Sequence, residues 1–295
     1  MIGDFVGVSM KTETIESRGI VPFRSVHVPT DFSQGSHRAF EHALRLAVDG
    51  QTELRLLHVG KDKNPPWDEF PGVRHTLARW GVLERNSDKS DVLDLGVEPT
   101  KFFLRTRNPV KAILKDLQAT RPDLIVMATH ARVGLARIFQ SSLCKKVARY
   151  SHLPTLMVPH GSEGLVEENT GKLILERILI PISPEVAPAR AVKLAGRFVA
   201  TLNCKQVVAR LIYIGDQGDG PAIDVEDTEK MTWEYVSRPG DVLDELNKEV
   251  THFKPDLVVM MSRGRDSVMD TFMPGKLETL TGFANCPILT ENVAF

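Results

Sequence analysis

The sequence predicts an α/β protein built from two tandem copies of a doubly wound parallel sheet. The first observation is an internal repeat, in which Arg121-Pro-Asp-Leu-Ile-Val-Met127 reads against Lys254-Pro-Asp-Leu-Val-Val-Met260. The second is a match between Ser25–Asp31 and Arg177–Ser183 at the other end of the repeat. The third is that short apolar runs alternate with segments of helical period in each half, which is typical of parallel strands covered by crossover helices.

The repeat also divides the chain into segments. Residues 1–21 are expected to form an N-terminal tail, residues 22–160 a first domain and residues 174–295 a second domain. The connecting residues 161–173 combine turn formers with charges and have no sustained hydrophobic period, so they are expected to form a linker.

Strands alternate with helices along the first domain. Apolar stripes in Phe40–Ala47 and Val110–Leu117 recur at the spacing of a packed helix face, and Val73–Glu84 is expected to be a further helix. Asn108, followed by Pro109, is a helix N-cap with proline in the first turn. The expected strands are Ser25–Pro29, Leu54–Val59, Lys101–Leu104, Leu124–Met127 and Thr155–Val158.

The second domain repeats this order with one helix missing. An apolar stripe runs through Val192–Leu202, and Asp241 stands where the first domain has Asn108. Asp216–Glu226 is expected to be a loop in place of the helix predicted at 73–84. The expected strands are Ile178–Ile182, Val207–Ile214, Thr232–Val236, Leu257–Met261 and Ile288–Thr290.

Composition limits the classes of function. Lys and Arg number 37 against 38 Asp and Glu, a formal charge of -1, so the basic excess of a nucleic-acid-binding protein is missing. The three cysteines show no C-x-x-C spacing, which predicts neither a disulfide framework nor a metal site. Because no apolar run is long enough to span a membrane and the N-terminus lacks a signal-peptide pattern, we expect a cytoplasmic protein without a membrane partner.

Five motifs follow one another along the first domain: Val26–Ser33, Leu56–Val59, Asn108-Pro109, Asp123–His130 and Leu153–Val158. In this order they resemble the universal stress protein (UspA) family. The resemblance covers roughly residues 22–160 and 174–295, so the chain is similar to a tandem member with two fused copies. It implies a five-stranded parallel sheet of order 3-2-1-4-5 in each copy, a nucleotide crevice in some members, and dimerisation through the last strand.

The crevice is expected where the strand order reverses, between the first and fourth strands, because ligands of open parallel sheets bind there. The resemblance implies ATP or another adenine nucleotide as the candidate ligand of the first domain; no other cofactor and no catalytic residue is expected. The candidate nucleotide-binding residues are Pro29, Thr30, Asp31, Val59, Ala128, His130, Ala131, Arg132, Ser141 and Ser142.

The sequence departs from the phosphate loop of the ATP-binding relatives, which carries three glycines and a final serine or threonine. Ala128, Ala131 and Ser141 occupy the glycine positions, and only the hydroxyl of Ser142 is retained. We therefore expect a degenerate site in which Cβ atoms stand where backbone must approach phosphate.

The second domain departs further. Pro274 lacks a backbone donor, Gly275 lacks the hydroxyl, and Ser183 stands where the first domain has Asp31. Nucleotide binding is therefore expected in the first domain alone.

Alternatives remain open for the polar candidates. Asp31 is either an acceptor for adenosine or a turn-forming acid before a helix. Ser141 and Ser142 either bind phosphate or cap the following helix, and His130 and Arg132 either meet an anion or are solvated.

The leading function is a non-enzymatic stress-response module that binds a small ligand or a partner protein. The alternative is an ATP-binding switch that hydrolyses the nucleotide slowly. The two domains are expected to pack as an intramolecular pseudo-dimer through Thr155–Val158 and Ile288–Thr290, since each strand would otherwise leave an unpaired edge, and a homodimer is a further candidate.

The segment 61–99 contains Trp67, Phe70 and Trp80 in a charged, proline-containing setting. We expect a partly mobile flap beside the first crevice, the alternative being that its helix belongs to the core.

Overall fold

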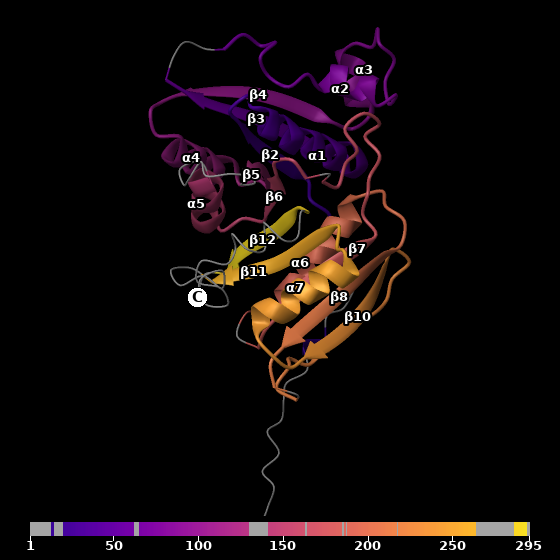
Figure 1. Cartoon of the computed structure of the whole chain (residues 1–295). Helices are drawn as coiled ribbons and strands as arrows, with labels where there is room; N and C mark the ends of the chain where they lie inside the picture. The colour runs from indigo at the N-terminus through magenta and orange to yellow at the C-terminus, as the bar shows by residue number, and fades with distance from the viewer. Residues whose placement is uncertain are drawn as a thin grey trace, which may run out of the picture.

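The computed structural model describes residues 13–14, 20–61, 65–129, 141–162, 164–184, 186, 188–216, 218–263 and 286–293. A ten-stranded sheet forms its centre (Figure 1), and a further pair of short strands forms a separate sheet. The ten strands are β2 (Ser25–Thr30), β3 (Glu53–Gly60), β4 (Glu98–Arg105), β5 (Leu124–Thr129), β6 (Thr155–Pro159), β7 (Arg177–Ile182), β8 (Val207–Ile214), β10 (Met231–Arg238), β11 (Leu257–Arg263) and β12 (Ile288–Val293). The separate pair is β1 (Glu13–Thr14) with β9 (Ile223–Asp224).

The strand order across the sheet is β10-β8-β7-β11-β12-β6-β5-β2-β3-β4. β6 and β12 are antiparallel, with Leu156 opposite Leu289, and the other neighbouring strands of the sheet are parallel. The expected pairing of the two final strands is therefore confirmed. The two sheets expected from the sequence are joined into one continuous sheet, because each final strand satisfies the backbone groups that the other would leave unpaired.

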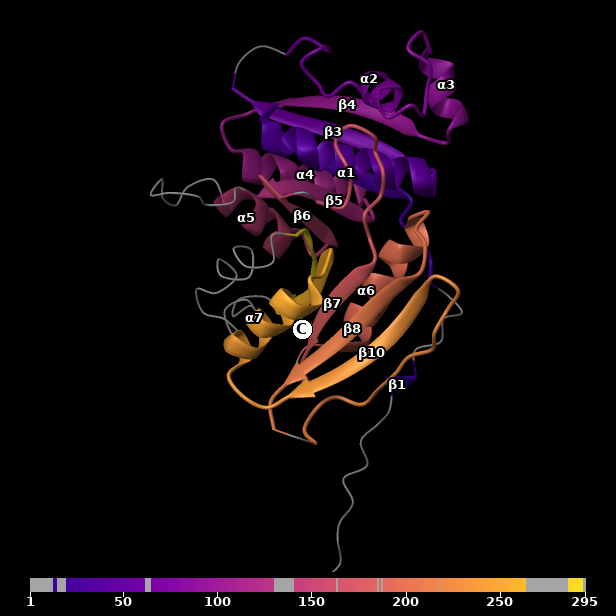
Figure 2. The ribbon, with the colours of Figure 1, turned by 45° about the vertical axis from the view of Figure 1, so that its right-hand side comes forward.

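Helices cover both faces of this sheet (Figure 2). On one face lie α1 (Gln34–Gly50) and α6 (Pro188–Thr201), with α2 (Val73–Arg79) and α3 (Lys89–Asp94) near the β4 edge. On the other face lie α4 (Pro109–Thr120), α5 (Ser141–Ser151) and α7 (Val242–Phe253). The buried side chains form two clusters, one on each face, and each cluster extends across both halves of the chain. The fold is thus α/β with a mostly parallel sheet.

The helix starts follow the capping residues that the sequence indicates. Asn108 accepts a hydrogen bond from the backbone N–H of Lys111 at the start of α4. Asp241 accepts from the N–H groups of Leu243 and Asp244 at the start of α7. Each such cap contributes about 1 kcal/mol to helix stability.

The segment between β3 and β4 differs from the flap expected there. Phe70 and Trp80 are nearly buried and Leu77 is fully buried, while Trp67 is exposed. The indole N–H of Trp80 donates to the carbonyl oxygen of Glu168 at 3.0 Å. α2 therefore belongs to the core, which is the alternative to the flap, because its apolar face packs on α1 and on the linker.

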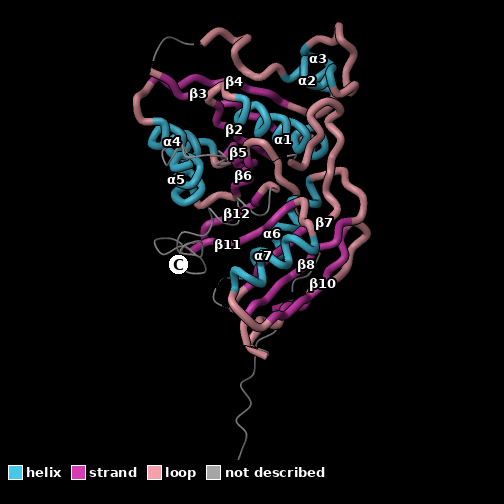
Figure 3. The backbone as a smooth tube through the Cα atoms, in the orientation of Figure 1, coloured by secondary structure: helices cyan, strands magenta, loops and turns pink. Residues whose placement is uncertain are grey.

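The linker is fastened to α1 rather than free. Leu165 and Val166 are buried, and the N–H of Leu165 donates to Nε2 of His42 at 2.8 Å. Burial lowers the pKa of His42 to about 4, so the ring stays neutral and accepts this bond while Nδ1 donates to the carbonyl of Arg38. The loops and turns that complete the path of the chain appear pink in Figure 3. Within the described residues, none of the helices has the length and apolar character that crossing a membrane requires.

Candidate functional site

A cavity of about 390 Å³ lies at the carboxyl ends of β2 and β5, and we call it the first crevice. β3 lies on one side of β2 and β5 on the other, so the order of strands along the chain reverses at this point. Ligands of open parallel sheets bind at such switch points. The volume falls within the range of roughly 300–1,000 Å³ that is usual for small-molecule sites.

Five of the predicted site residues line this cavity: Pro29, Thr30, Asp31, Val59 and Ala128. The predictions at 130–132 (His130, Ala131 and Arg132) fall outside the described residues. Ser141 and Ser142 open helix α5, whose next residues Leu143 and Cys144 line the cavity; the two serine side chains are not among those described.

Hydroxyl groups at the start of α1 form the polar wall. Ser33 is the N-cap of α1, and its side chain accepts from the N–H of Ser36. The hydroxyls of Ser36 and Thr30 are 3.0 Å apart and hydrogen-bonded. The positive end of the α1 dipole therefore borders the cavity. Sequence reasoning missed Ser33 and Ser36, although Asp-Phe-Ser before an apolar stripe is a capping signal.

Asp31 is held in a defined orientation at this wall. Its Oδ1 accepts from the backbone N–H of Ser33 at 3.0 Å and from the Ser33 hydroxyl at 2.5 Å. Burial raises the pKa of Asp31, but the hydrogen bonds from Ser33 and Ser36 outweigh it and hold the pKa below its usual value. The turn-forming role is thus present. A carboxylate has about four acceptor positions, so the same group can take further donors from a ligand.

The methyl group of Ala128 packs beneath the start of α1. A Cβ placed on Gly35 would lie 3.4 Å from the Cβ of Ala128 and 3.5 Å from Nδ1 of His160. The Cβ of Ala128 therefore lies near the start of α1 and also lines the cavity.

The remaining wall is apolar and was missed from the sequence. Leu57 and Met127 come from the sheet, Ile113 comes from α4, and Leu143 comes from α5. Cys144 also lines the cavity, but burial raises the pKa of its thiol to about 12, so it is not a nucleophile at neutral pH.

The arrangement suits reversible binding of a partly apolar ligand. It combines one ionised carboxylate, several hydroxyls and an apolar wall, but no nucleophile paired with a base has been found in the parts of the chain that the structure describes. Within the same parts, His, Cys, Asp and Glu form no group that could hold a metal ion.

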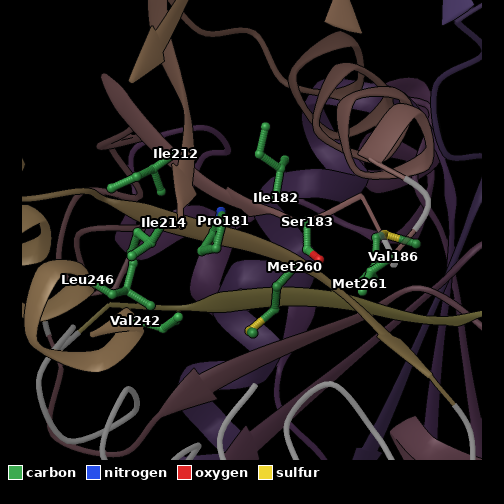
Figure 4. Close-up of a pocket in the computed structure, with 10 residues that line it drawn as sticks. All are labelled: Pro181, Ile182, Ser183, Val186, Ile212, Ile214, Val242, Leu246, Met260 and Met261. Atoms are coloured by element: carbon green, nitrogen blue, oxygen red, sulfur yellow. The ribbon is translucent and has the colours of Figure 1, made fainter. Parts of the chain in front are cut away.

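The second half contains an equivalent crevice of only about 40 Å³ (Figure 4). Ile182, Ser183 and Met261 occupy the places of Thr30, Asp31 and Ala128. In Figure 4 the side chains of Ile214, Val242 and Leu246 gather on the same side of this pocket, which is lined mainly by apolar groups. The residues expected to disable it at 274–275 lie outside the described residues.

These features define a class: an α/β protein with a ligand-sized crevice at the switch point of a parallel sheet. Residues 22–159 match the sequence model of the universal stress protein family. The chain is 26% identical over 143 residues to universal stress protein MJ0531 of Methanocaldococcus jannaschii, covering 46% of this chain and 82% of that protein. It is 25% identical over 147 residues to universal stress protein YxiE of Bacillus subtilis, covering 46% of this chain and 99% of that protein.

Solved structures extend the likeness of fold to nearly the whole chain. A universal stress protein from Archaeoglobus fulgidus superposes with a TM-score of 0.58 at 17% identity and covers 90% of this chain and 97% of its own. A functionally unknown protein, PA1789 of Pseudomonas aeruginosa, superposes with a TM-score of 0.54 at 13% identity and covers 92% of each chain. The fold of the C-terminal half is therefore included in the likeness.

Proposed function

We propose that this chain is a tandem universal stress protein whose first crevice binds a small ligand, with an adenine nucleotide as the leading candidate. The observation that carries the proposal is the cavity of about 390 Å³ at the switch point, bordered by the ionised carboxylate of Asp31. In this role the protein is a binding module for stress signalling rather than an enzyme.

The composition of the walls supports a nucleoside ligand. Leu57, Val59 and Met127 offer apolar surface to a planar base, and Asp31 offers an acceptor to ribose hydroxyls. The first turn of α5 lines the cavity at Leu143, so the backbone N–H groups at the start of that helix are available to an anionic group.

The second crevice is proposed to have lost this role. A site that has Ile182 in place of the Thr30 hydroxyl and Ser183 in place of the Asp31 carboxylate leaves polar groups of a nucleotide unpaired, at about 1–3 kcal/mol for each group. The second copy instead supplies β12, which pairs with β6 and takes the place of a partner subunit.

Titration calorimetry of the full chain with ATP tests the proposal. The full chain is needed, because separate halves would expose the edges of β6 and β12. Asp31→Ala is expected to weaken binding by at least about tenfold, since a hydrogen bond to a charged group contributes roughly 1.5–3 kcal/mol. The matched control, Ser183→Ala in the second crevice, is expected to leave the Kd within about twofold. No binding of ATP to the wild type, or an unchanged Kd in Asp31→Ala, contradicts the nucleotide assignment.

The same complex distinguishes the slowly hydrolysing switch. Phosphate release from bound ATP, measured over hours, is expected to match the rate without protein. Release that is faster with the wild type and lost in Asp31→Ala would favour the switch instead.

A further inference from the structure

A second ligand-sized hollow lies in the C-terminal half, on the face of the sheet covered by α6. Its volume is about 420 Å³, within the range of roughly 300–1,000 Å³ of small-molecule sites. One wall is α6, represented by Val192, Gly196 and Ala200, and the other is the segment that runs from Val225 to Trp233. We call this space the α6 hollow.

The hollow exists because the second half lacks the counterpart of α2. In the first half, Glu41 on α1 is fully buried and paired with Arg79 of α2. The equivalent residue of α6, Lys193, is exposed. The side chains on this face of α6 are also smaller than those of α1. Phe40 and Leu44 of α1 are fully buried, whereas α6 has Val192 and Gly196 at the matching positions.

Short hydrogen bonds hold the outer wall in place. The N–H of Thr228 donates to the carbonyl of Met231 at 2.8 Å, and the N–H of Trp233 donates to Oδ1 of Asp227 at 2.8 Å. Lys230 Nζ donates to the carbonyl of Leu202 at 3.0 Å and so ties this wall to the end of α6. The wall is therefore preformed, which lowers the entropic cost of binding.

The lining selects a flat apolar group. The half-buried ring of Trp233 belongs to one wall, and the other presents Gly196 and Ala200, which have little or no side chain. The side chain of Ile20 packs directly on Gly196, since a Cβ on Gly196 would lie only 2.7 Å from its Cδ1, so Ile20 forms part of this wall. An aromatic ring between these walls gains apolar burial and ring contact with the indole.

The rim selects a positive charge. Glu226 and Glu229 line the hollow and are exposed, and Asp224 and Asp227 lie in the same short segment. Among the described residues of the lining, Lys230 is the one basic residue, and its Nζ donates to the carbonyl of Leu202 at the end of α6. The carboxylates of Glu226 and Glu229 outnumber the ammonium of Lys230 among these lining residues, which favours a cation at the mouth.

We propose that the α6 hollow is a binding site for a small amphipathic cation, that is, a planar aromatic group carrying a protonated amine. The ring lies between Trp233 and the wall formed by α6 and Ile20, and the ammonium group lies at Glu226 and Glu229. The site is separate from the first crevice, so it does not depend on the nucleotide assignment.

Three probes with one ring system and different charges test this site by titration calorimetry on the full chain: 2-naphthylmethylamine, 2-naphthylmethanol and 2-naphthoate. The amine is expected to bind at least about tenfold more tightly than the naphthoate, with the alcohol between them. Added salt is expected to weaken binding of the amine and to leave binding of the alcohol unchanged, because salt screens the interaction of the ammonium group with the carboxylates. Saturating ATP is expected to leave the Kd of the amine unchanged.

Two sets of variants separate the contributions of shape and charge. Ala200→Phe fills the hollow and is expected to weaken binding of all three probes by at least about tenfold. Glu226→Gln combined with Glu229→Gln is expected to weaken binding of the amine alone, by about fivefold. This is the loss expected when two exposed charge interactions of roughly 0.5 kcal/mol each are removed. The matched control, Asp216→Asn with Asp219→Asn, removes two charges from the loop between β8 and β9, outside the lining, and is expected to change the Kd by less than twofold.

The proposal is overturned if the naphthoate binds as tightly as the amine, or if no probe binds at millimolar concentration. It is equally overturned if the glutamine pair has no larger effect than the asparagine pair. The glutamine variants change exposed side chains, so they remain folded and decide the question even where Ala200→Phe does not fold.

Discussion

A single buried histidine shows how the two halves have diverged at the scale of the residue. His27 is nearly buried on β2, and both of its ring nitrogens lack a hydrogen-bond partner. Asp116, whose Oδ2 lies 3.5 Å from Nε2 of His27, is bonded to Arg55. In the second half Leu179 is the equivalent of His27, so the matching position there is occupied by an apolar residue.

Stability is expected to fall in acid because of this residue. Burial lowers the pKa of His27 from 6.5 to about 4, with Asp116 opposing that effect and Arg55 adding to it. The unfolded chain binds a proton near pH 6.5 while the folded protein does not. The stability contributed by the neutral ring is therefore present above pH 6.5 and is lost as pH falls toward 4, by up to roughly 3 kcal/mol.

Replacing the histidine by the residue of the duplicate tests this account. His27→Leu is expected to raise the free energy of unfolding by about 1–3 kcal/mol at pH 7, since two unpaired polar atoms leave the core, and by more at pH 5. Urea unfolding at both pH values measures the change. The reciprocal control, Leu179→His, is expected to destabilise by about 1–3 kcal/mol. A loss of stability in His27→Leu at both pH values contradicts the account.

At the scale of the element, the contact between linker and α2 depends on one glycine. Gly171 has a φ of 65°, and a Cβ at this position would lie 2.3 Å from Cδ2 of Trp80. Gly161 also has a positive φ, 82°, but a Cβ there would meet nothing within 4 Å. The two glycines thus share the backbone cost of a side chain and differ in the steric cost.

Gly171→Ala is therefore expected to destabilise more than Gly161→Ala. Gly161→Ala, the control, is expected to lower the free energy of unfolding by about 1 kcal/mol, because alanine adopts this backbone conformation less readily than glycine. Gly171→Ala carries the same backbone cost, and overpacking against Trp80 is expected to add about 1–3 kcal/mol. Thermal unfolding of the two variants gives the difference. Equal losses of stability would show that the indole of Trp80 can move aside without a loss of stability and that the linker is held only loosely against α2.

The protection of α2 gives a second test at this scale. Because Leu77 is fully buried and Arg79 is paired with Glu41, amides of Val73–Arg79 are expected to exchange with solvent on the same timescale as those of α1. Native-state hydrogen exchange measures both helices in one experiment. Exchange of α2 much faster than that of α1 would restore the flap interpretation.

Several elements could be predicted from sequence because their signals are local. The capping residues Asn108 and Asp241 and the alternation of strands with helices are of this kind, as is the repeat. α3 was not predicted even though Asp88 and Asp91 form a capping box, because the helix spans only Lys89–Asp94 and carries no periodic stripe. The pairing of β1 with β9 joins segments far apart in sequence, and nothing local indicates it.

The candidate site divides in the same way. Pro29, Asp31 and Ala128 could be predicted because they end strands that meet at the switch point. Ile113 and Leu143 could not, since which turn of a crossover helix faces a crevice depends on how that helix packs on the sheet.

At the scale of the whole molecule, the halves are expected to unfold together. The sheet is continuous, each core cluster extends across both halves, and Arg197 Nη2 donates to Oδ1 of Asp123 at 3.0 Å between them. Urea unfolding followed by circular dichroism should show one transition.

Fluorescence in a Trp233→Phe background tests the coupling, because the remaining tryptophans, Trp67 and Trp80, both lie in the first half. Phe198→Ala in the second half is expected to cost about 3–5 kcal/mol and to move the fluorescence midpoint to lower urea. An unchanged midpoint, with two steps in circular dichroism, would show that the halves are independent.

The antiparallel junction of β6 and β12 has a consequence for how such a chain can change over generations. In a homodimer built on the same strand pairing, every substitution appears twice, so loss of a ligand site in one subunit is loss in both. Once the partners are joined in one polypeptide, each substitution is inherited by one copy alone. One half can then keep Asp31 while the other has Ser183. The second copy can change its crevice while the pairing of β6 with β12 is preserved.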